Sequence, residues 1–318
     1  MSRNRVVQLT ALATAVVVLV WIALSIWSGA SRLSVGAVDW KYVSAVFACM
    51  LVLVIVYGLA WWLLMCRLER RRLAAWPAVR LFALSWAGRY FPAGIPHYAG
   101  RLLAGPSAGM SRTAVAASLA YENLLVLAVG AAGAALCLSV ASVAGGAPTP
   151  WILAGLVIAA LSFGATLPWP LRWLIDVAEP RVPKLASLRG HILALGSITW
   201  LSAAYALGFV LNGGAYYFAL LAVGESPPPL VAFAAYNIAG VIGMLAIGVP
   251  SGLGVREAVV AALMGAVMPV PLALSAAVLV RVAGIAADLV PAAVAGASFA
   301  VRRPPVVDTA RPTMREAA

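Results

Sequence analysis

Long uninterrupted apolar runs restrict what this 318-residue chain can fold into. Residues 42–66 contain no charged side chain, and residues 114–143 contain only Glu122. About 20 apolar residues in a helix, rising about 1.5 Å per residue, cross the hydrocarbon core of a bilayer. Four further runs have a suitable length, namely residues 6–30, 151–167, 192–223 and 271–300. We therefore predict an all-α polytopic integral membrane protein with about six full spans.

The composition agrees with a membrane location. The chain is 64% hydrophobic and 10% charged, against about 25% charged residues in soluble domains, which excludes an ordinary soluble enzyme. A formal net charge of +12 could indicate nucleic-acid binding. The basic residues, however, lie in short segments between the apolar runs, as in cytoplasmic loops that face anionic lipid headgroups. We predict no nucleic-acid partner.

The arginines also predict the orientation of the chain. Residues 67–80 hold five arginines and one acid, Glu69, which places this loop in the cytoplasm by the positive-inside rule. Basic residues before residue 6 and after residue 300 then place both termini in the cytoplasm. Residues 168–190 combine basic residues with Trp169 and Trp173, a pattern typical of an interfacial helix on the same side.

Proline and glycine interrupt two further apolar regions. Residues 81–105 are broken around Pro92, Gly94 and Pro96, and residues 230–268 are broken at positions 250–254. Because these residues interrupt helical hydrogen bonding, we predict re-entrant or broken helices, the first opening from the cytoplasm and the second from outside. Opposed broken helices are typical of inverted-repeat transporters. We expect residues 1–303 to form one transmembrane domain and residues 304–318 a short disordered cytoplasmic tail.

Ionisable side chains gather around the two breaks, although each costs at least about 2.5 kcal/mol at membrane depth. Four arginines (Arg89, Arg101, Arg256, Arg281) outnumber three acids (Glu122, Glu257, Asp288). One interpretation is mutual pairing: Arg256 with Glu257, Arg281 with Asp288, and Glu122 with an arginine of the first break. The other is that the surplus cation and the backbone N–H groups at the broken helix ends bind an anion such as phosphate.

Thirteen residues at these positions are candidate substrate-binding residues: Arg89, Tyr90, Pro92, Gly94, His97, Arg101, Glu122, Pro250, Gly252, Gly254, Arg256, Glu257 and Arg281. We favour a hydrogen-bonding role for His97 over proton transfer. The three cysteines have no metal-ligand spacing, and no nucleotide-binding, zinc-protease or serine-hydrolase motif occurs. We therefore predict no catalytic residue, metal or cofactor, and a protein that is not an enzyme.

The two breaks resemble the lysylphosphatidylglycerol synthetase transmembrane family, the flippase-like domain of multiple-peptide-resistance factors and of stand-alone bacterial and archaeal proteins. The first match is Tyr-x-Pro-x-Gly at residues 90–94, followed by His97, Tyr98 and Arg101, and the second is Pro-x-Gly-x-Gly-x-Arg-Glu at residues 250–257. Glu122 and Arg281 also fit, whereas Ala93 and Asn123 depart from the family pattern. The resemblance implies a stand-alone lipid-translocating member, without the aminoacyltransferase domain, in a bacterial or archaeal cytoplasmic (inner) membrane.

The leading hypothesis is a flippase that moves a lipid with an anionic or aminoacylated headgroup between leaflets, either a (glyco)phospholipid or a polyprenyl-phosphate-linked lipid. Arg89, Arg101 and Arg256 would contact phosphate, while Glu122 and Glu257 would pair with them or with a cationic headgroup. The alternatives are a membrane-embedded lipid or polyprenyl transferase and a non-transporting, lipid-binding regulator of envelope synthesis. The expected partners are a lipid with a phosphate-containing headgroup, a second copy of the chain and a separately encoded lipid-synthesising enzyme.

Overall fold

The fold is described from a computed structural model, which covers residues 38–90, 95–144, 149–164, 166–246, 252 and 254–301. Within these ranges the chain forms helices and connecting loops and no strand, which confirms the predicted all-α class. The predicted first span at residues 6–30 and the predicted tail at residues 304–318 lie outside the described residues.

Among the described residues, four helices are long and apolar enough to cross a membrane: α2 (Trp40–Leu68), α5 (Arg112–Ala144), α8 (Leu195–Ala222) and α11 (Val270–Val301). They coincide with four of the predicted spans and confirm a multi-pass membrane protein. Helix α6 (Thr149–Gly164), which lies on the next predicted span, has 16 residues. That length corresponds to about 24 Å, less than the roughly 30 Å of a hydrocarbon core, so a crossing by this helix stays a prediction.

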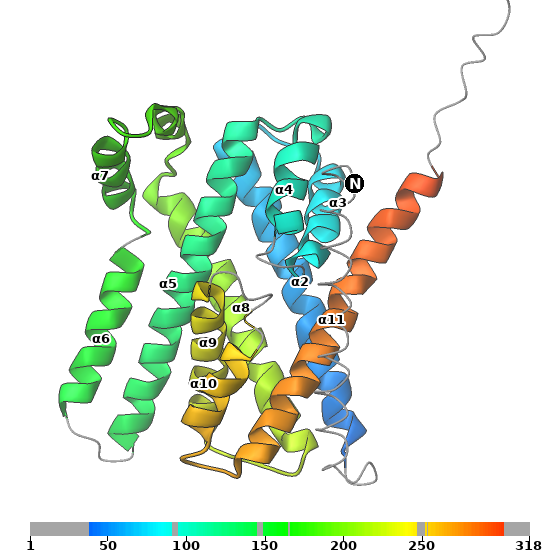
Figure 1. The fold of residues 1–318 in the computed structure, drawn as a ribbon, viewed down its shortest axis with the longest axis vertical. Coiled ribbons are helices and arrows are strands. Elements are labelled where there is room, and N and C mark those ends of the chain that lie inside the picture. The colour runs from blue at the N-terminus through cyan, green and yellow to red at the C-terminus, as the bar shows by residue number, and fades with distance from the viewer. Residues whose placement is uncertain are drawn as a thin grey trace, which may run out of the picture.

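The two interrupted regions form two helix pairs. The first pair is α3 (Ala75–Trp86) and α4 (Ile95–Ala104), joined through the 3-10 helix η2 (Ala87–Tyr90), and the second is α9 (Pro229–Leu245) and α10 (Val255–Met264). Figure 1 shows α3 and α4 at one end of the bundle and α9 and α10 towards the other. The opposed placement fits the predicted broken elements, whereas re-entry into a membrane and the inverted repeat stay predictions.

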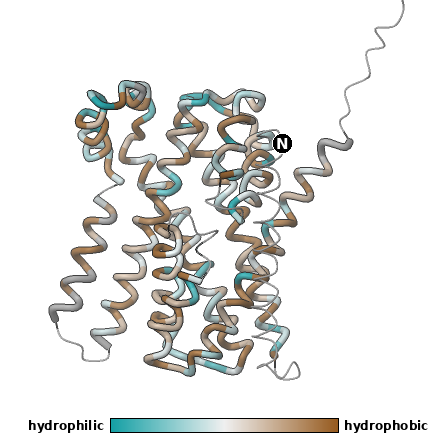
Figure 2. The backbone as a smooth tube through the Cα atoms, viewed as in Figure 1, coloured by the Kyte–Doolittle hydropathy of each residue, from teal (hydrophilic) through white to brown (hydrophobic). Residues whose placement is uncertain are grey.

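The remaining short elements lie at the end of the bundle that carries α3 and α4. They are η4 (Pro106–Ala108), α7 (Pro168–Ala178) and η5 (Pro183–His191). Arg70 Nη2 donates to the Gly190 carbonyl at 3.2 Å, so the loop after α2 meets η5 here. Hydrophilic segments gather at this end (Figure 2).

Two buried apolar clusters hold the bundle together, and their side chains differ in size. The first joins the second half of α2 to α3, α5 and the start of α8, and it contains large side chains such as Trp61, Phe82 and Leu125. The second joins the start of α2 to the end of α8 and to α9, α10 and α11. Its buried residues include many alanines, at positions 215, 219, 232, 235, 239, 273, 276, 277, 283 and 287. Small residues allow close helix approach in membranes.

Glu69 in the loop after α2 holds the start of α5. One carboxylate oxygen accepts the backbone N–H of Ser111 at 2.6 Å, and Arg71 Nε lies 3.6 Å from the other. Partial burial raises the pKa of Glu69, but the hydrogen bonds from Ser111 and the charge of Arg71 outweigh burial and leave the pKa below its ordinary value of 4.5. The ionised carboxylate therefore stabilises the folded state.

Glu69→Gln is expected to lower the free energy of unfolding by about 0.5 kcal/mol at neutral pH, because the variant lacks the charge beside the helix N-terminus. A group with a depressed pKa in the folded state stabilises above its unfolded pKa and loses this effect as the pH falls through the folded pKa. The difference between wild type and variant should thus vanish at acidic pH. Thermal unfolding in detergent between pH 7 and pH 3 measures it, and a constant difference across that range would contradict the charge-based role.

Candidate functional site

A cavity of about 480 Å³ lies where the two helix pairs approach each other. The first pair contributes Arg89 and His97 to its wall, and the second contributes Gly252 and Arg256. Helices α2, α5, α8 and α11 complete the lining. Segments far apart in the sequence thus share one cavity, as the sequence analysis expected for the two breaks.

Seven of the thirteen candidate residues line this cavity: Arg89, Tyr90, His97, Glu122, Gly252, Arg256 and Arg281. Arg101 and Glu257 contact the lining residues Glu122 and Arg281 without being part of the wall, and Gly254 donates to Glu257. The remaining three candidates, Pro92, Gly94 and Pro250, lie outside the described residues.

Arg89 in η2 pairs with Asp288 in α11. Its Nη2 lies 2.7 Å from Asp288 Oδ2, and the carboxylate also accepts the Trp86 indole N–H at 3.2 Å and the Tyr90 hydroxyl. The guanidinium stacks over the Trp86 ring at 4.5 Å from its centroid. These contacts fasten the first helix pair to α11. The pairing of Asp288 with Arg281, which their spacing on one helix had suggested, is wrong.

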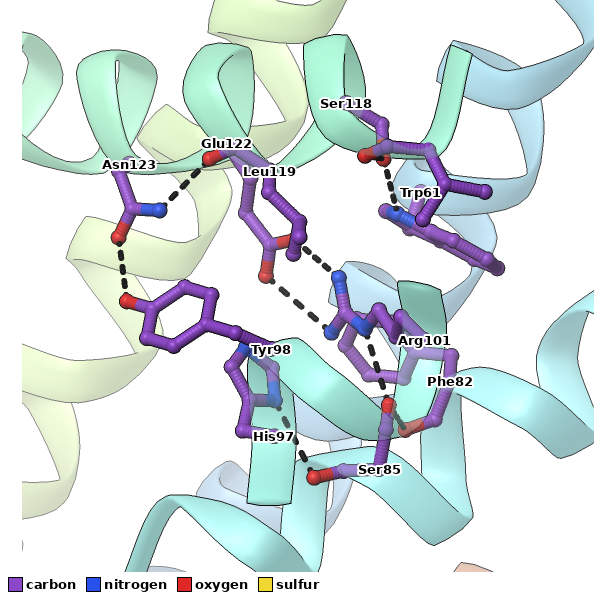
Figure 3. A network of polar contacts seen from close by, with 11 residues as sticks. Trp61, Phe82, Ser85, His97, Tyr98, Arg101, Ser118, Leu119, Glu122 and Asn123 are labelled. Atoms are coloured by element: carbon purple, nitrogen blue, oxygen red, sulfur yellow. Dashed lines mark hydrogen bonds and ion pairs between the residues drawn. The ribbon is translucent and has the colours of Figure 1, made fainter. Parts of the chain in front are cut away.

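Arg101 in α4 is fully buried and pairs with Glu122 in α5. Its guanidinium donates to both Glu122 oxygens, and its Nε donates to the Ser85 hydroxyl at 2.9 Å (Figure 3). The charge also lies 4.9 Å from the Trp61 ring centroid and 4.6 Å from that of Phe82. Glu122 therefore takes an arginine of the first break, as one interpretation expected, and the pair holds α4 against α5.

His97 and Tyr98 follow the same break and make neutral hydrogen bonds. His97 Nδ1 lies 3.2 Å from the Ser85 carbonyl oxygen, so this nitrogen carries the proton and donates. The Tyr98 hydroxyl donates to Asn123 Oδ1 at 3.1 Å (Figure 3). This geometry agrees with a hydrogen-bonding role for His97.

Arg281 in α11 pairs with Glu257 in α10, at 2.7 Å between Nη1 and Oε1. The second Glu257 oxygen accepts the backbone N–H of Gly254 at 2.7 Å and so caps the start of α10. Gly254 has a φ of +78°, a conformation that glycine adopts readily. The alternative pairing of Glu257 with its neighbour Arg256 is wrong.

Arg256 is the fourth arginine near the cavity and takes part in none of these three ion pairs. Each of the three acids binds another arginine, and among the described residues no acid pairs with Arg256. Its Nε is buried without a hydrogen-bond partner in this part of the chain. Arg256 is also the second residue of α10, where the helix dipole adds partial positive charge. Two positive features coincide at the cavity wall and suit an anion.

Two glycines, Gly243 in α9 and Gly252 in the second break, allow α9 to lie close to the break and to the Arg256 side chain. A Cβ on Gly243 would lie 2.6 Å from Arg256 Cγ, and one on Gly252 would lie 2.6 Å from the Gly243 Cα. Gly252 has a φ of +65°, so a side chain there would also strain the backbone. Gly252 therefore shapes the break through its backbone, and Gly243 supports the Arg256 stem.

Gly243→Ala is expected to lower the free energy of unfolding by about 1–3 kcal/mol, because the new methyl group overlaps the Arg256 side chain. Gly240→Ala is the matched control, since Gly240 also lies in α9 at the cavity wall and nothing lies within 4 Å of its added Cβ. Thermal unfolding of both variants in detergent provides the comparison. Equal stability would show that the close approach at Gly243 is unimportant.

Sequence reasoning missed several polar residues of the cavity. Asn212 Nδ2 donates to Asn237 Oδ1 at 3.1 Å and links α8 to α9. Tyr57, Tyr98, Asn123, Tyr205 and Tyr236 also line the wall. The asparagines could have been identified from the sequence, because they lie inside apolar runs. In a membrane such amide side chains form hydrogen bonds to neighbouring helices. Among the described residues, no three His, Cys, Asp or Glu side chains come together as metal ligands.

The fold and the cavity define a helical membrane protein in which two opposed helix pairs share an arginine-rich cavity. The sequence model of one family, described as the lysylphosphatidylglycerol synthase TM region, matches residues 8–292. The chain belongs to this family, which confirms the resemblance at the two breaks and indicates a lipid-related function in a membrane. No curated protein matches the chain.

Proposed function

We propose that this protein translocates a lipid with a phosphate-containing headgroup between the leaflets of the cytoplasmic membrane. Arg256 carries the proposal, because its Nε is buried without a hydrogen-bond partner and no acid pairs with its charge among the described residues, in a cavity shared by both helix pairs. An uncompensated buried charge costs several kcal/mol. A phosphate would offset that cost with oxygens that match the two-pronged guanidinium.

The other arginines have supporting roles in this proposal. Arg89 and Arg281 line the cavity but are bound to Asp288 and Glu257, so they shape the wall and its potential. Arg101 is fully buried and bound to Glu122, so it holds α4 against α5 and does not line the cavity. The phosphate role that the sequence analysis shared among three arginines is therefore assigned to Arg256.

Opposed helix pairs suit alternating access to the two leaflets. The first pair lies at one end of the bundle and the second towards the other (Figure 1), and both contribute residues to the cavity wall. Movement of one pair at a time would open the cavity to one leaflet while the other stays closed. Without a recognised nucleotide motif, we propose downhill exchange or coupling to an ion gradient.

We propose that the end carrying α7 faces the cytoplasm. The basic loop after α2 meets η5 there through Arg70 and Gly190. Exposed Trp169 and Trp173 on α7 suit a membrane interface. Basic residues follow α11 in the sequence at positions 302 and 303, which supports a cytoplasmic C-terminus by the positive-inside rule.

The alternative function, a transferase that acts on a lipid, has less support than transport. The oxygens of Glu122 accept from Arg101, and those of Glu257 contact Arg281 and the Gly254 N–H. Neither carboxylate is in a position typical of a general base, which needs a free oxygen directed at the substrate. We therefore propose transport rather than an enzymatic function.

Lipid exchange in reconstituted vesicles tests the proposal. Vesicles contain a trace of fluorescent phosphatidylglycerol, and an impermeant reductant bleaches the probe in the outer leaflet. We expect the protein to expose the inner-leaflet probe to the reductant at least tenfold faster than in protein-free vesicles, with or without an imposed ion gradient. Exchange equal to that of protein-free vesicles would exclude translocation, and a new lipid product would favour a transferase.

A further inference from the structure

We infer that the cavity selects lipids whose headgroup is net negative and rejects aminoacylated headgroups that carry free ammonium groups. This inference rests on the proposed lipid translocation and concerns which lipid binds. It departs from the lipid in the family's description, which bears a lysyl group. Three observations on the charges and hydrogen bonds of the cavity support it.

The first observation is the balance of charge around the cavity. Among the residues that the structure describes, four arginines and three acids lie in or next to its wall, which leaves one positive charge in excess. Residues 91–94 and 247–251, which complete the two breaks, contain no ionisable side chain. A net negative headgroup neutralises the excess, whereas a headgroup with more ammonium than phosphate charge increases it.

The second observation is that the carboxylates already have partners. Both Glu122 oxygens accept from Arg101, and the Asp288 oxygens accept from the Trp86 indole and the Tyr90 hydroxyl. Glu257 divides its oxygens between Arg281 and the Gly254 N–H. A buried ammonium needs a carboxylate or several acceptors to replace its water. Binding a lysyl headgroup would therefore break an existing ion pair.

The third observation is that several neutral groups of the wall already have partners. Asn237 Oδ1 accepts from Asn212, and its amide N–H groups donate to the Phe209 and Phe233 carbonyls. The Trp86 ring already stacks with the Arg89 guanidinium. The Tyr236 ring stacks on Tyr216, with 4.6 Å between centroids. These contacts reduce the capacity for cation–π binding.

Lipid-dependent thermal stabilisation of the detergent-solubilised protein tests the selectivity apart from transport. The probes are phosphatidylglycerol, phosphatidylethanolamine, phosphatidylcholine and lysyl-phosphatidylglycerol with the same acyl chains, together with inorganic phosphate. We expect half-maximal stabilisation by phosphatidylglycerol at a concentration at least tenfold lower than by any other lipid. We expect none from inorganic phosphate at the same concentrations. Stabilisation by inorganic phosphate would indicate a soluble anion site and overturn the lipid assignment.

Gly240 offers a way to reverse the selectivity. It lies at the cavity wall with nothing within 4 Å of an added Cβ, so Gly240→Asp would place a carboxylate in open space, and Gly240→Asn is the neutral control of the same size. We expect the Asp variant to reduce the preference for phosphatidylglycerol over the lysyl lipid at least tenfold and the Asn variant to keep it. Wild type that binds both lipids equally would overturn the selectivity while leaving vesicle exchange intact. Absence of exchange would instead overturn the proposed function.

Discussion

Replacing Arg256 by methionine is expected to slow the exchange of phosphatidylglycerol in vesicles at least tenfold and to raise the thermal stability of the lipid-free protein. Hydrogen bonds to a charged group contribute about 1.5–3 kcal/mol, and each 1.4 kcal/mol is about tenfold in an equilibrium constant. In the absence of lipid this half-buried side chain has a buried Nε without a hydrogen-bond partner, and no acid pairs with its charge among the described residues. An apolar residue of similar length removes that cost.

Opposite changes in exchange and stability separate a binding role from a folding defect, because a misfolded variant would lose both. Arg256→Lys keeps the charge but lacks the two-pronged donor, so an intermediate rate is expected. Arg172→Met on the exposed face of α7 is the matched control and should leave exchange unchanged. Wild-type exchange in the Arg256→Met variant would remove the phosphate role from this residue.

Breaking the Arg101–Glu122 pair is expected to destabilise the protein by about 3–5 kcal/mol in either single variant, Arg101→Met or Glu122→Gln. Each single change leaves the remaining charged side chain buried without an ion-pair partner. Arg101 is fully buried next to the Trp61 and Phe82 rings, and Glu122 is buried as well. The double variant Arg101→Met, Glu122→Gln should recover most of the loss. Thermal unfolding in detergent and the yield of monodisperse protein measure the effect.

The exposed pair of Arg189 with Asp176 and Glu179 provides the comparison for this buried pair. Arg189→Met should cost less than about 1 kcal/mol, because water and salt screen exposed charges. A double variant at Arg101 and Glu122 that is no more stable than the single variants would show that the pair acts through packing. Single variants as stable as wild type would contradict the structural role of the pair.

Apolar runs predicted the spanning helices well, because about 20 apolar residues between loops have few alternatives to a membrane helix. Helices α2, α5, α8 and α11 fall on four predicted runs. The positions of proline and glycine predicted where the helices of residues 81–105 and 230–268 are interrupted. Pattern alone did not define the length of α6, whose helix ends at Gly164, three residues before the end of the predicted run.

The sequence predicted the pairing of Glu122 with an arginine of the first break, but it did not predict the partners of Asp288 and Glu257. Spacing along one helix suggested Arg281 with Asp288, yet η2 brings Arg89 to Asp288 and α10 brings Glu257 to Arg281. Periodicity reports neighbours within a helix, whereas these pairs form between helices whose packing is set by the whole fold. The count of charges gave one surplus arginine, and the fold shows that it is Arg256. Gly243 was missed because its role depends on the approach of α9 to the break.

The two apolar clusters differ in the size of many of their side chains, and this difference bears on how easily their helices can slide past each other. Around α3, large rings interlock, as in the stacking of Phe82 on Trp86 with centroids 5.0 Å apart. Where α9 meets α8 and α11, many of the buried side chains are alanines, although Tyr216 also stacks on Tyr236 there. Sliding past a smooth face disturbs fewer contacts than sliding past an interlocked one. If the protein translocates lipid as we propose, the movement of the α9–α10 pair should therefore be larger than that of the α3–α4 pair.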